Sequence, residues 1–309
     1  MSAHGSEVRM LSLKRALVCP LIATVLTLCV TTANLEPVNA SATSGNAEVA
    51  LGVRYLNGDG VPKDIAKALH YFQLAAAQGN ADGENDLGSM YEHGHGVSQD
   101  YATALHYYQL AAAQGNASGE TNLGNMYEWG NGVHQDYTQS VHYFQLAAAQ
   151  GNAQGEADLG NFYRAGLGGV HKDYTQAVHY FQLAAAQGNS DGENDLGSMY
   201  AIGFGVPQDY ATALHYYQLA AAQGNASGEI NLGYMYERGH GVPQDYATAL
   251  RYYQLAAAQG SAIAAADVQR VRPLAPAQAG QQVPSVSQLL SPRTVPPSRQ
   301  TARLTDVHS

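Results

Sequence analysis

Histidine is the residue type with the widest chemical reach in this chain, because an imidazole can ligate a metal ion or move a proton near neutral pH. Five of the 12 histidines recur at one position of a repeated sequence, where the sixth copy has Arg251: His70, His106, His142, His179 and His215. Neighbouring helical units lie on the order of 10 Å apart, whereas zinc ligands lie about 2 Å from their ion. We therefore expect solvated histidines on an outer face and no metal.

A tighter cluster, Glu92-His93-Gly94-His95, could place two imidazoles on the same side of a turn. The matching stretch of a nearly identical copy reads Ala201-Ile202-Gly203-Phe204, so the pair is not part of the repeated design. Metal binding at this turn stays open as an alternative to a plain surface loop.

One glutamate also recurs in each copy, and paired carboxylates can act as general acid and base. These residues are Glu48, Glu84, Glu120, Glu156, Glu193 and Glu229. Their place in the first turn of a predicted helix has a sufficient explanation, because the helix dipole favours negative charge there. No Ser-His-Asp order, phosphate-binding loop or nucleotide fingerprint accompanies them. The sequence predicts neither an enzyme nor a cofactor.

The histidines and glutamates lie in segments of sequence that repeat at a fixed interval. The heptapeptide LAAAQGN occurs at 74–80, 110–116, 146–152, 183–189 and 219–225, and returns as LAAAQGS at 255–261. Successive copies lie 36 or 37 residues apart, and a period of roughly 20–50 residues is typical of stacked repeats. Such an array grows by adding units and needs no closed core.

Residues 80–115 show why one unit predicts a pair of helices. Asn80 or Asp82 can cap a first helix, and Gly88 leaves room on it for a neighbouring helix. The residues expected on its packed face are Gly83, Leu87, Met90 and Tyr91. Gly94 then suits a turn, because glycine adopts the left-handed conformation that ends many helices.

The second helix of the unit begins near Asp100, a plausible cap, and ends at Gly115. Its expected buried stripe combines large rings with small residues: Ala104, Tyr107, Tyr108 and Ala111. Only the next unit can cover this face, so each helical hairpin must pack on its neighbour. The three alanines of LAAAQG then allow close approach, and the following asparagine caps the next helix.

These residues resemble the Sel-one-like repeats (SLR), relatives of the tetratricopeptide repeats (TPR). The matching pattern is L-G-x-x-Y-x-x-G-x-G-V-x-x-D-x-x-x-A-x-x-Y-x-x-x-A-A-x-x-G, met by Leu87-Gly88, Tyr91, Gly94, Gly96, Val97, Asp100, Ala104, Tyr107, Ala111-Ala112 and Gly115. The resemblance implies an all-α fold, an α-solenoid wound as a right-handed superhelix of six helix-turn-helix repeats with a C-terminal capping helix. The units are 46–79, 80–115, 116–151, 152–188, 189–224 and 225–260, with the cap at 261–271. The fourth carries an extra residue within 167–169.

The two ends differ from the repeats. Three basic residues precede an apolar run at 16–30: Arg9, Lys14 and Arg15. With the small-x-small sequence Val38-Asn39-Ala40, they predict a secretory signal peptide over 1–40, followed by a linker at 41–45. Met10 is a suspected start of translation, and an uncleaved membrane anchor is the alternative. Residues 272–309 are rich in Pro, Ser and Gln and predict disorder or, alternatively, a Pro-rich ligand for another domain.

The charge of the repeat region limits its partners. Residues 41–272 hold 22 Asp and Glu against 9 Lys and Arg, and this negative surface repels phosphate backbones. Nucleic acid is therefore excluded as a ligand. We expect a monomer that meets a membrane only through its N-terminal segment, if that segment is uncleaved.

The copies differ most at the end of the first helix and in the turn. In TPR-like arrays this helix lines a concave groove, so we expect variation there to tune recognition, with neutral drift as the alternative. The predicted partner-binding groove consists of Asn85, Ser89, Glu92, His93, Thr121, Asn125, Glu128, Trp129, Asn161, Arg164, Asn194, Ser198, Ile202, Ile230, Tyr234, Glu237 and Arg238. Trp129, Tyr234 and Ile202 are the expected anchors.

The predicted signal peptide indicates an exported protein, periplasmic or secreted. The resemblance implies an interaction scaffold or adaptor that binds a protein or peptide segment in bacterial envelope processes or host contact. One alternative is a cell-wall or β-lactam hydrolase-like enzyme, as some cysteine-rich relatives are described. Cys19 and Cys29 both lie in the predicted signal peptide, which weakens that analogy. The other alternative is a purely structural spacer.

Overall fold

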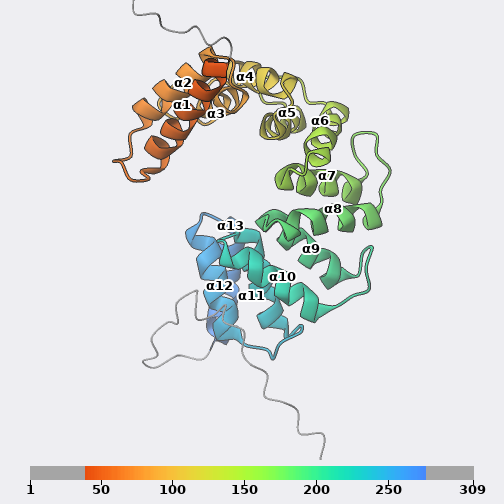
Figure 1. The fold of residues 1–309 in the computed structure, drawn as a ribbon. Coiled ribbons are helices and arrows are strands. Elements are labelled where there is room, and N and C mark those ends of the chain that lie inside the picture. The colour runs from red at the N-terminus through yellow and green to blue at the C-terminus, as the bar shows by residue number, and fades with distance from the viewer. Residues whose placement is uncertain (1–38, 276–309) are drawn as a thin grey trace, which may run out of the picture. The chain divides into compact units, whose positions relative to one another are not determined.

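The computed structural model describes residues 39–275, and they form an array of helices (Figure 1). This part of the chain contains thirteen α-helices, a short 3-10 helix at Arg272–Leu274, and no strand. The α-helices are α1 (Asn39–Asn57), α2 (Ile65–Ala77), α3 (Ala81–His93), α4 (Tyr101–Ala113), α5 (Ala117–Trp129), α6 (Tyr137–Ala149), α7 (Ala153–Ala165), α8 (Tyr174–Ala186), α9 (Ser190–Ile202), α10 (Tyr210–Ala222), α11 (Ala226–Arg238), α12 (Tyr246–Ala258) and α13 (Ala262–Val271). The predicted all-α repeat fold is confirmed.

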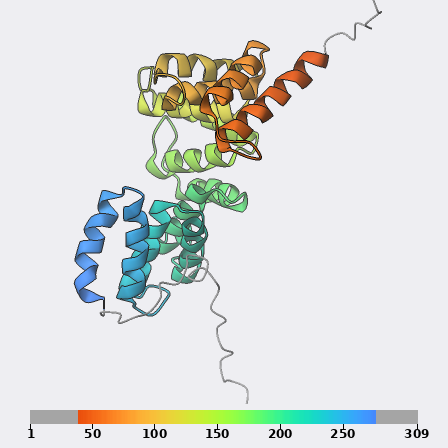
Figure 2. The ribbon, with the colours of Figure 1, turned by 90° about the vertical axis from the view of Figure 1, so that its left-hand side faces the viewer.

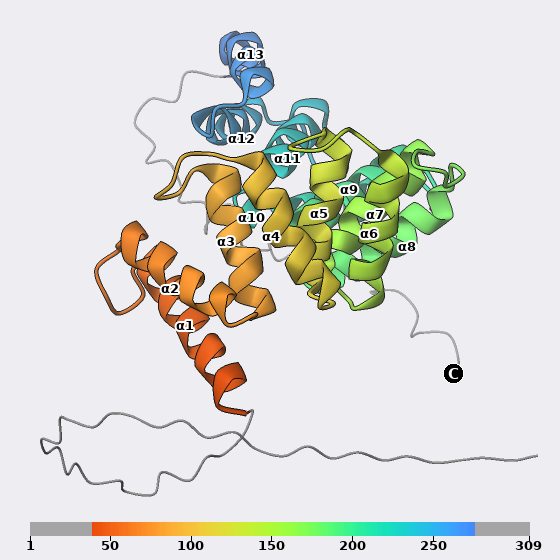
Figure 3. The ribbon, with the colours of Figure 1, turned by 90° about the horizontal axis from the view of Figure 1, so that it is seen from above.

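The helices pair into hairpins that stack in chain order, as the views in Figures 2 and 3 also show. We call the odd-numbered helices α1 to α11 the A helices and the even-numbered helices α2 to α12 the B helices. Each A helix packs on the B helix of its own hairpin, and each one after α1 also packs on the B helix of the hairpin before it. Each hairpin therefore covers the exposed face of its predecessor, as the sequence predicts.

Side chains at the helix ends explain why the units begin and end where they do. The Asn80 side chain accepts a hydrogen bond from the Gly83 amide, and Asp100 accepts bonds from the amides of Ala102 and Thr103. Gly94 ends α3 in the left-handed conformation, with φ of 69°, which costs glycine little. The same caps recur along the array, so local sequence sets the helix boundaries.

The apolar core is divided into small clusters, one at each contact between hairpins. Between the second and third hairpins it consists of Ala104, Tyr108, Leu123 and Met126. Tyr107, predicted to be buried with this stripe, is half-buried and stacks on Tyr91 with ring centroids 6.0 Å apart. Similar tyrosine pairs occur in every hairpin, and they bind its two helices together at the edge of the core.

Two glycines on each A helix of the later repeats make room for the two B helices beside it. A Cβ at Gly124 would lie 2.6 Å from the Phe144 ring of the same hairpin, and one at Gly119 would lie 2.7 Å from Ala111 of the hairpin before. Both distances are shorter than a carbon–carbon contact allows. The packing role predicted for the equivalent Gly88 is confirmed, since its Cβ would lie 2.8 Å from the Tyr108 ring.

The recurring glutamates of repeats two to six prove to be structural and buried, whereas Glu48 of the first repeat is half-buried. The Glu84 carboxylate accepts a hydrogen bond of 2.6 Å from Gln114, the glutamine of LAAAQG in the same repeat. Equivalent bonds join Glu120 to Gln150, Glu156 to Gln187, Glu193 to Gln223 and Glu229 to Gln259. Burial raises the pKa of Glu84, and the bond from Gln114 opposes that rise. The first-turn position alone did not reveal this contact between the two ends of each repeat.

The first and last helices differ from the units between them. Helix α1 begins at Asn39, so residues 41–45, predicted as a linker, are helical. Helix α13 closes the other end by packing Val268 and Val271 on Ala249 and Tyr253 of α12. Gln269, which replaces the packing glycine, is exposed, and within residues 39–275 only the short 3-10 helix follows α13, with no B helix to cover this side chain. The capping role expected of 261–271 agrees with this packing.

The predicted signal peptide, apart from residues 39 and 40, and most of the predicted tail lie outside the described residues. Between residues 39 and 275, none of the helices has both the length and the apolar character that a membrane crossing requires.

Replacing Gly124 by Ala tests the close contact in the core. Alanine favours an isolated helix by about 1 kcal/mol, but its methyl group would overlap the buried Phe144 ring. We expect Gly124→Ala to lower the free energy of unfolding by roughly 1–3 kcal/mol, measured by urea denaturation. Gln269→Ala, at the same register of α13, should change it by less than about 0.5 kcal/mol. A more stable Gly124→Ala variant would contradict this account of the packing.

Candidate functional site

The A helices form one continuous surface of the array. Successive A helices contact one another, whereas no two B helices of the described residues make contacts as extensive. The A helices therefore lie on the inner side of the turn from hairpin to hairpin. We call their exposed surface the inner face.

The larger of two pockets on this face lies mainly between α5 and α7, and we call it the acidic pocket. It has a volume of about 610 Å³. It is lined by Glu92, Asn125, Glu128, Trp129, Gln154, Asp158, Asn161, Phe162, Arg164, Ala165 and Leu167. Leu167 comes from the loop with the extra residue, so the one irregular repeat contributes to the wall of this pocket.

Asp158 is the most perturbed acid of the acidic pocket. Its Oδ1 atom accepts a hydrogen bond of 3.1 Å from Gln154, while its buried Oδ2 atom has no hydrogen-bond partner. Burial raises the pKa of Asp158 to about 7, opposed by the Gln154 bond and assisted by the carboxylates of Glu128, Asp191 and Asp195. Because a charge is costly to bury without a partner, this group is poised to take up a proton or a cation.

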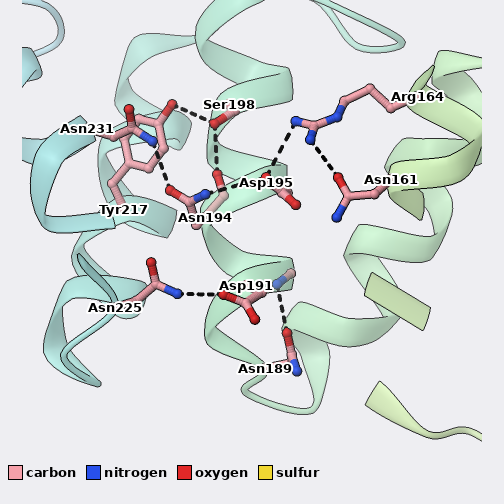
Figure 4. A network of polar contacts seen from close by, with 11 residues as sticks. Asn161, Arg164, Asn189, Asp191, Asn194, Asp195, Ser198, Tyr217, Asn225 and Asn231 are labelled. Atoms are coloured by element: carbon pink, nitrogen blue, oxygen red, sulfur yellow. Dashed lines mark hydrogen bonds and ion pairs between the residues drawn. The ribbon is translucent and has the colours of Figure 1, made fainter. Parts of the chain in front are cut away.

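Arg164 is the one positively charged residue that lines the acidic pocket. Its guanidinium donates to Asn161 Oδ1 at 2.6 Å and pairs with Asp195 Oδ1 at 3.5 Å (Figure 4). Asp195 belongs to α9, so this pair joins the A helices of neighbouring hairpins. Arg164 is thus directed toward Asp195, and it forms no ion pair with Asp158 or Glu128.

The smaller pocket lies mainly between α9 and α11, and we call it the neutral pocket. It has a volume of about 300 Å³ and is lined by Ser198, Ala201, Ile202, Tyr210, Tyr217, Asn231, Tyr234, Met235 and His240. Tyr217 donates to Ser198 at 3.1 Å, and Asn231 donates to Asn194 at 2.8 Å (Figure 4). These bonds fix polar side chains beside the pocket.

The two pockets occupy the same place in the repeat, two repeats apart. Equivalent pairs in the acidic and neutral pockets are Asn125 and Ser198, Glu128 and Ala201, Trp129 and Ile202, Asp158 and Asn231, Asn161 and Tyr234, and Phe162 and Met235. The two pockets therefore share one backbone arrangement but differ in the charge and the aromatic side chains of their lining residues. The chain itself supplies a neutral counterpart for both acids that α5 and α7 contribute to the acidic pocket, Glu128 and Asp158.

The structure brings nine of the seventeen predicted groove residues into these pockets. Six line the acidic pocket: Glu92, Asn125, Glu128, Trp129, Asn161 and Arg164. Three line the neutral pocket: Ser198, Ile202 and Tyr234. Six more lie outside both: Asn85, Ser89, His93, Asn194, Ile230 and Arg238. Of these, Ile230 packs against the core cluster that α12 and α13 form together.

The remaining two predicted groove residues are buried, so their assignment to an open groove is corrected. Thr121 donates to the Ala117 carbonyl and contacts the capping side chain of Asn152. Glu237 accepts a hydrogen bond from Tyr253 and forms an ion pair with Arg270 of the capping helix. Both positions face a neighbouring helix, because stacking covers part of the surface that a single repeat would leave open.

Asp158 is the main pocket residue that the sequence analysis missed. The equivalent position reads Asp86, Asn122, Asp158, Asp195 and Asn231 in repeats two to six. A polar residue directly before the buried leucine of each A helix is a signal that could have identified this row. Burial also raises the pKa of Asp86, to about 6, so two acids of this row on the inner face, Asp86 and Asp158, share a raised pKa.

The recurring histidines lie where the sequence predicts, exposed on the B helices, each beside a tyrosine ring, as with His106 and Tyr107 at 5.5 Å. His93 and His95 stack with ring centroids 5.6 Å apart. Among residues 39–275, no three His, Cys, Asp or Glu side chains converge on a place for a metal ion.

Asp158→Asn tests the electrostatics of the acidic pocket. The Asp158 carboxyl has a pKa near 3.8 when unperturbed and about 7 in the folded protein. The folded state thus binds more protons between those values, and its stability falls as the pH rises through this window. We expect the variant to exceed wild type in free energy of unfolding by roughly 1–3 kcal/mol at pH 8 and by much less at pH 5.

Urea denaturation at pH 5, 6.5 and 8 measures this difference. Asp59→Asn, which removes an exposed carboxylate from the loop between α1 and α2, is the matched control for the loss of one charge. Parallel pH profiles for wild type and Asp158→Asn would show that the carboxyl is solvated and that its burial is misassigned.

Comparison with known proteins identifies the architecture. A family model described as the Sel1 repeat matches residues 45–80, 81–116, 117–152, 153–189, 190–225 and 226–261. No curated protein matches the chain. Proteins with these repeats typically mediate protein–protein interactions, and the scaffold is generally non-enzymatic.

Two solved structures are similar in both sequence and fold. One is a protective antigen present in uropathogenic Escherichia coli strains, displaying an SLR fold, with 38% identity and a TM-score of 0.59 over 78% of this chain and 52% of that one. This chain thus spans about half of the antigen's length. The other is a Sel1 repeat protein from Oxalobacter formigenes, with 30% identity and a TM-score of 0.62 over 71% of this chain and 88% of that one. By its six matched repeats and their helical stacking, the chain belongs to the Sel1 repeat family.

Proposed function

We propose that the chain is an exported scaffold that binds a segment of a partner protein along its inner face. The observation that carries this proposal is the exposure of three large apolar side chains in the two pockets. Trp129 is 68% exposed, Ile202 56% and Tyr234 44%. Large aromatic residues left in open pockets are typical anchors of protein interfaces, and family membership supports the same role.

The arrangement of the pockets favours an extended ligand. The two pockets recur at the same register of A helices that contact one another in series. A segment lying across these helices would meet first one pocket and then the other. The pockets lie between helices, and bonds within the array hold some of their polar groups, such as Asn161 and Ser198. This design suits recognition of a surface or peptide.

Export is supported by the basic residues and apolar run that precede the repeats. Cleavage after Ala40 would remove only the first two residues of α1. We expect N-terminal sequencing of the protein recovered from the periplasm or medium to begin near Ser41. Recovery of an uncleaved chain in the membrane fraction would favour the anchor instead.

The triple variant Trp129→Ser, Ile202→Ser and Tyr234→Ser tests the inner face as the binding surface. We expect cross-linking pull-downs from the native compartment to lose the partners that wild type retains. Removing one well-placed aromatic anchor typically costs 2 kcal/mol or more, about a thirtyfold loss of affinity. Circular dichroism should show unchanged helix content, because all three side chains are exposed.

The matched control replaces three exposed leucines on B helices: Leu74→Ser, Leu146→Ser and Leu219→Ser. It removes three exposed apolar side chains from the B helices and should leave the partners bound. Unchanged partners in both variants would favour a structural spacer. Loss in the control alone would place the binding surface on the B helices.

A further inference from the structure

The acidic and neutral pockets differ in charge although they share one backbone frame. Glu92, Glu128 and Asp158 line the acidic pocket, while no Asp or Glu lines the neutral pocket. Glu128 and Asp158 correspond to Ala201 and Asn231 in the neutral pocket. A packing requirement of the repeat cannot explain the acids, because the same hairpins stack without them.

The carboxylates of the acidic pocket are not neutralised within the described residues. The Glu92 carboxylate accepts a hydrogen bond from Tyr108 at 2.6 Å, which carries no positive charge. The Oδ2 atom of Asp158 is buried without a hydrogen-bond partner. Burial raises the pKa of Glu128, and none of the ion pairs of the described residues includes its carboxylate.

The charged groups around Asp158 leave a net negative field. Glu128, Asp191 and Asp195 all destabilise its charge, and Arg164 is engaged by Asp195 and Asn161. A cation entering from solvent would relieve this repulsion. Two carboxylates that share a site favour either a proton or a positively charged ligand.

Trp129 adds a second feature that suits a cation. Its side chain lines the same pocket and is among the most exposed large apolar side chains of the described residues. A tryptophan face attracts ammonium and guanidinium groups, and it can cover the alkyl stem of a long basic side chain. The pocket therefore combines a ring with unpaired acids.

We propose that the acidic pocket takes an arginine or lysine side chain of the partner segment, with Glu128 and Asp158 facing its charge and Trp129 covering its stem. This proposal rests on the function proposed above and specifies the partner's chemistry. The neutral pocket then takes an uncharged side chain of the same segment. Recognition depends on charge complementarity, so added salt weakens it.

Trp129 provides a direct readout, since it is the single tryptophan of the chain. The probes are two blocked heptapeptides, Ala-Ala-Leu-Arg-Leu-Ala-Ala and the same peptide with citrulline, the neutral isostere, in place of arginine. Titration into the full chain should change the Trp129 fluorescence. We expect the arginine peptide to bind at least tenfold more tightly than the citrulline peptide, with the difference shrinking at high salt.

The double variant Glu128→Ala and Asp158→Asn copies the neutral pocket into the acidic one. We expect it to reduce the arginine preference to less than twofold. The control, Asp59→Asn and Asp82→Asn, removes the same two charges from exposed sites outside the pocket and should keep the preference. Thermal unfolding of each variant shows whether the fold is retained.

Three results would overturn the proposal. They are equal binding of the two peptides, an arginine preference that survives in the double variant, and no fluorescence response to either peptide. If the pull-down partners still depend on Trp129, Ile202 and Tyr234 in any of these cases, the inner face remains the binding surface and only the cationic ligand is wrong.

The competing occupant is the chain's own C-terminal segment, which contains Arg293, Arg299 and Arg303 and lies outside the described residues. Replacing these three arginines by alanine in the full chain distinguishes the two. Unchanged affinity for the arginine peptide supports a separate partner. A tenfold or greater gain in affinity would show that the chain fills its own pocket and would overturn the assignment to a partner.

Discussion

The structure depends on the contact between an aromatic ring of each B helix and a glycine of the A helix beside it. With Phe144 against Gly124, the two helices approach until the ring fills the space that a side chain would occupy. Alanines of the B helix allow the next hairpin the same closeness, as Ala111 does beside Gly119. Because every unit repeats this contact, no central core is needed, and stability accumulates from one neighbour to the next.

The residues that pack the helices differ from those that line the pockets, so the inner face can vary between repeats. The residues that hold the stack lie on the sides of the A helices that meet B helices, while the pocket residues lie between successive A helices. Equivalent positions can therefore carry different residues on the same backbone: Ile202 is the equivalent of Trp129, and Asn231 is the equivalent of Asp158. Chemistry on this face can change at little cost to packing, which is the property that an interaction scaffold requires.

Buried polar contacts give the stack its register. Each Glu–Gln bond joins the start of an A helix to the end of the B helix in the same repeat, as in Glu84 and Gln114. The capping asparagines also reach back, as Asn116 does to Asp82 at 2.6 Å. A buried acid without such a partner would be costly, so the Glu–Gln bonds favour one alignment of the two helices within a hairpin. The asparagine bonds favour one alignment of neighbouring hairpins. Asp158 departs from this pattern, and it lies in the acidic pocket.

The sequence by itself determined the repeat length, the helix pairs, their caps and the packing glycines, because these follow from short-range spacing that recurs six times. It also placed Trp129, Ile202 and Tyr234 on one face. Only the tertiary structure decided which residues of that face are open, since stacking buries Thr121 and the capping helix covers Glu237. It likewise revealed the raised pKa of Asp158, because the burial of a side chain depends on the helices that surround it and not on its own repeat.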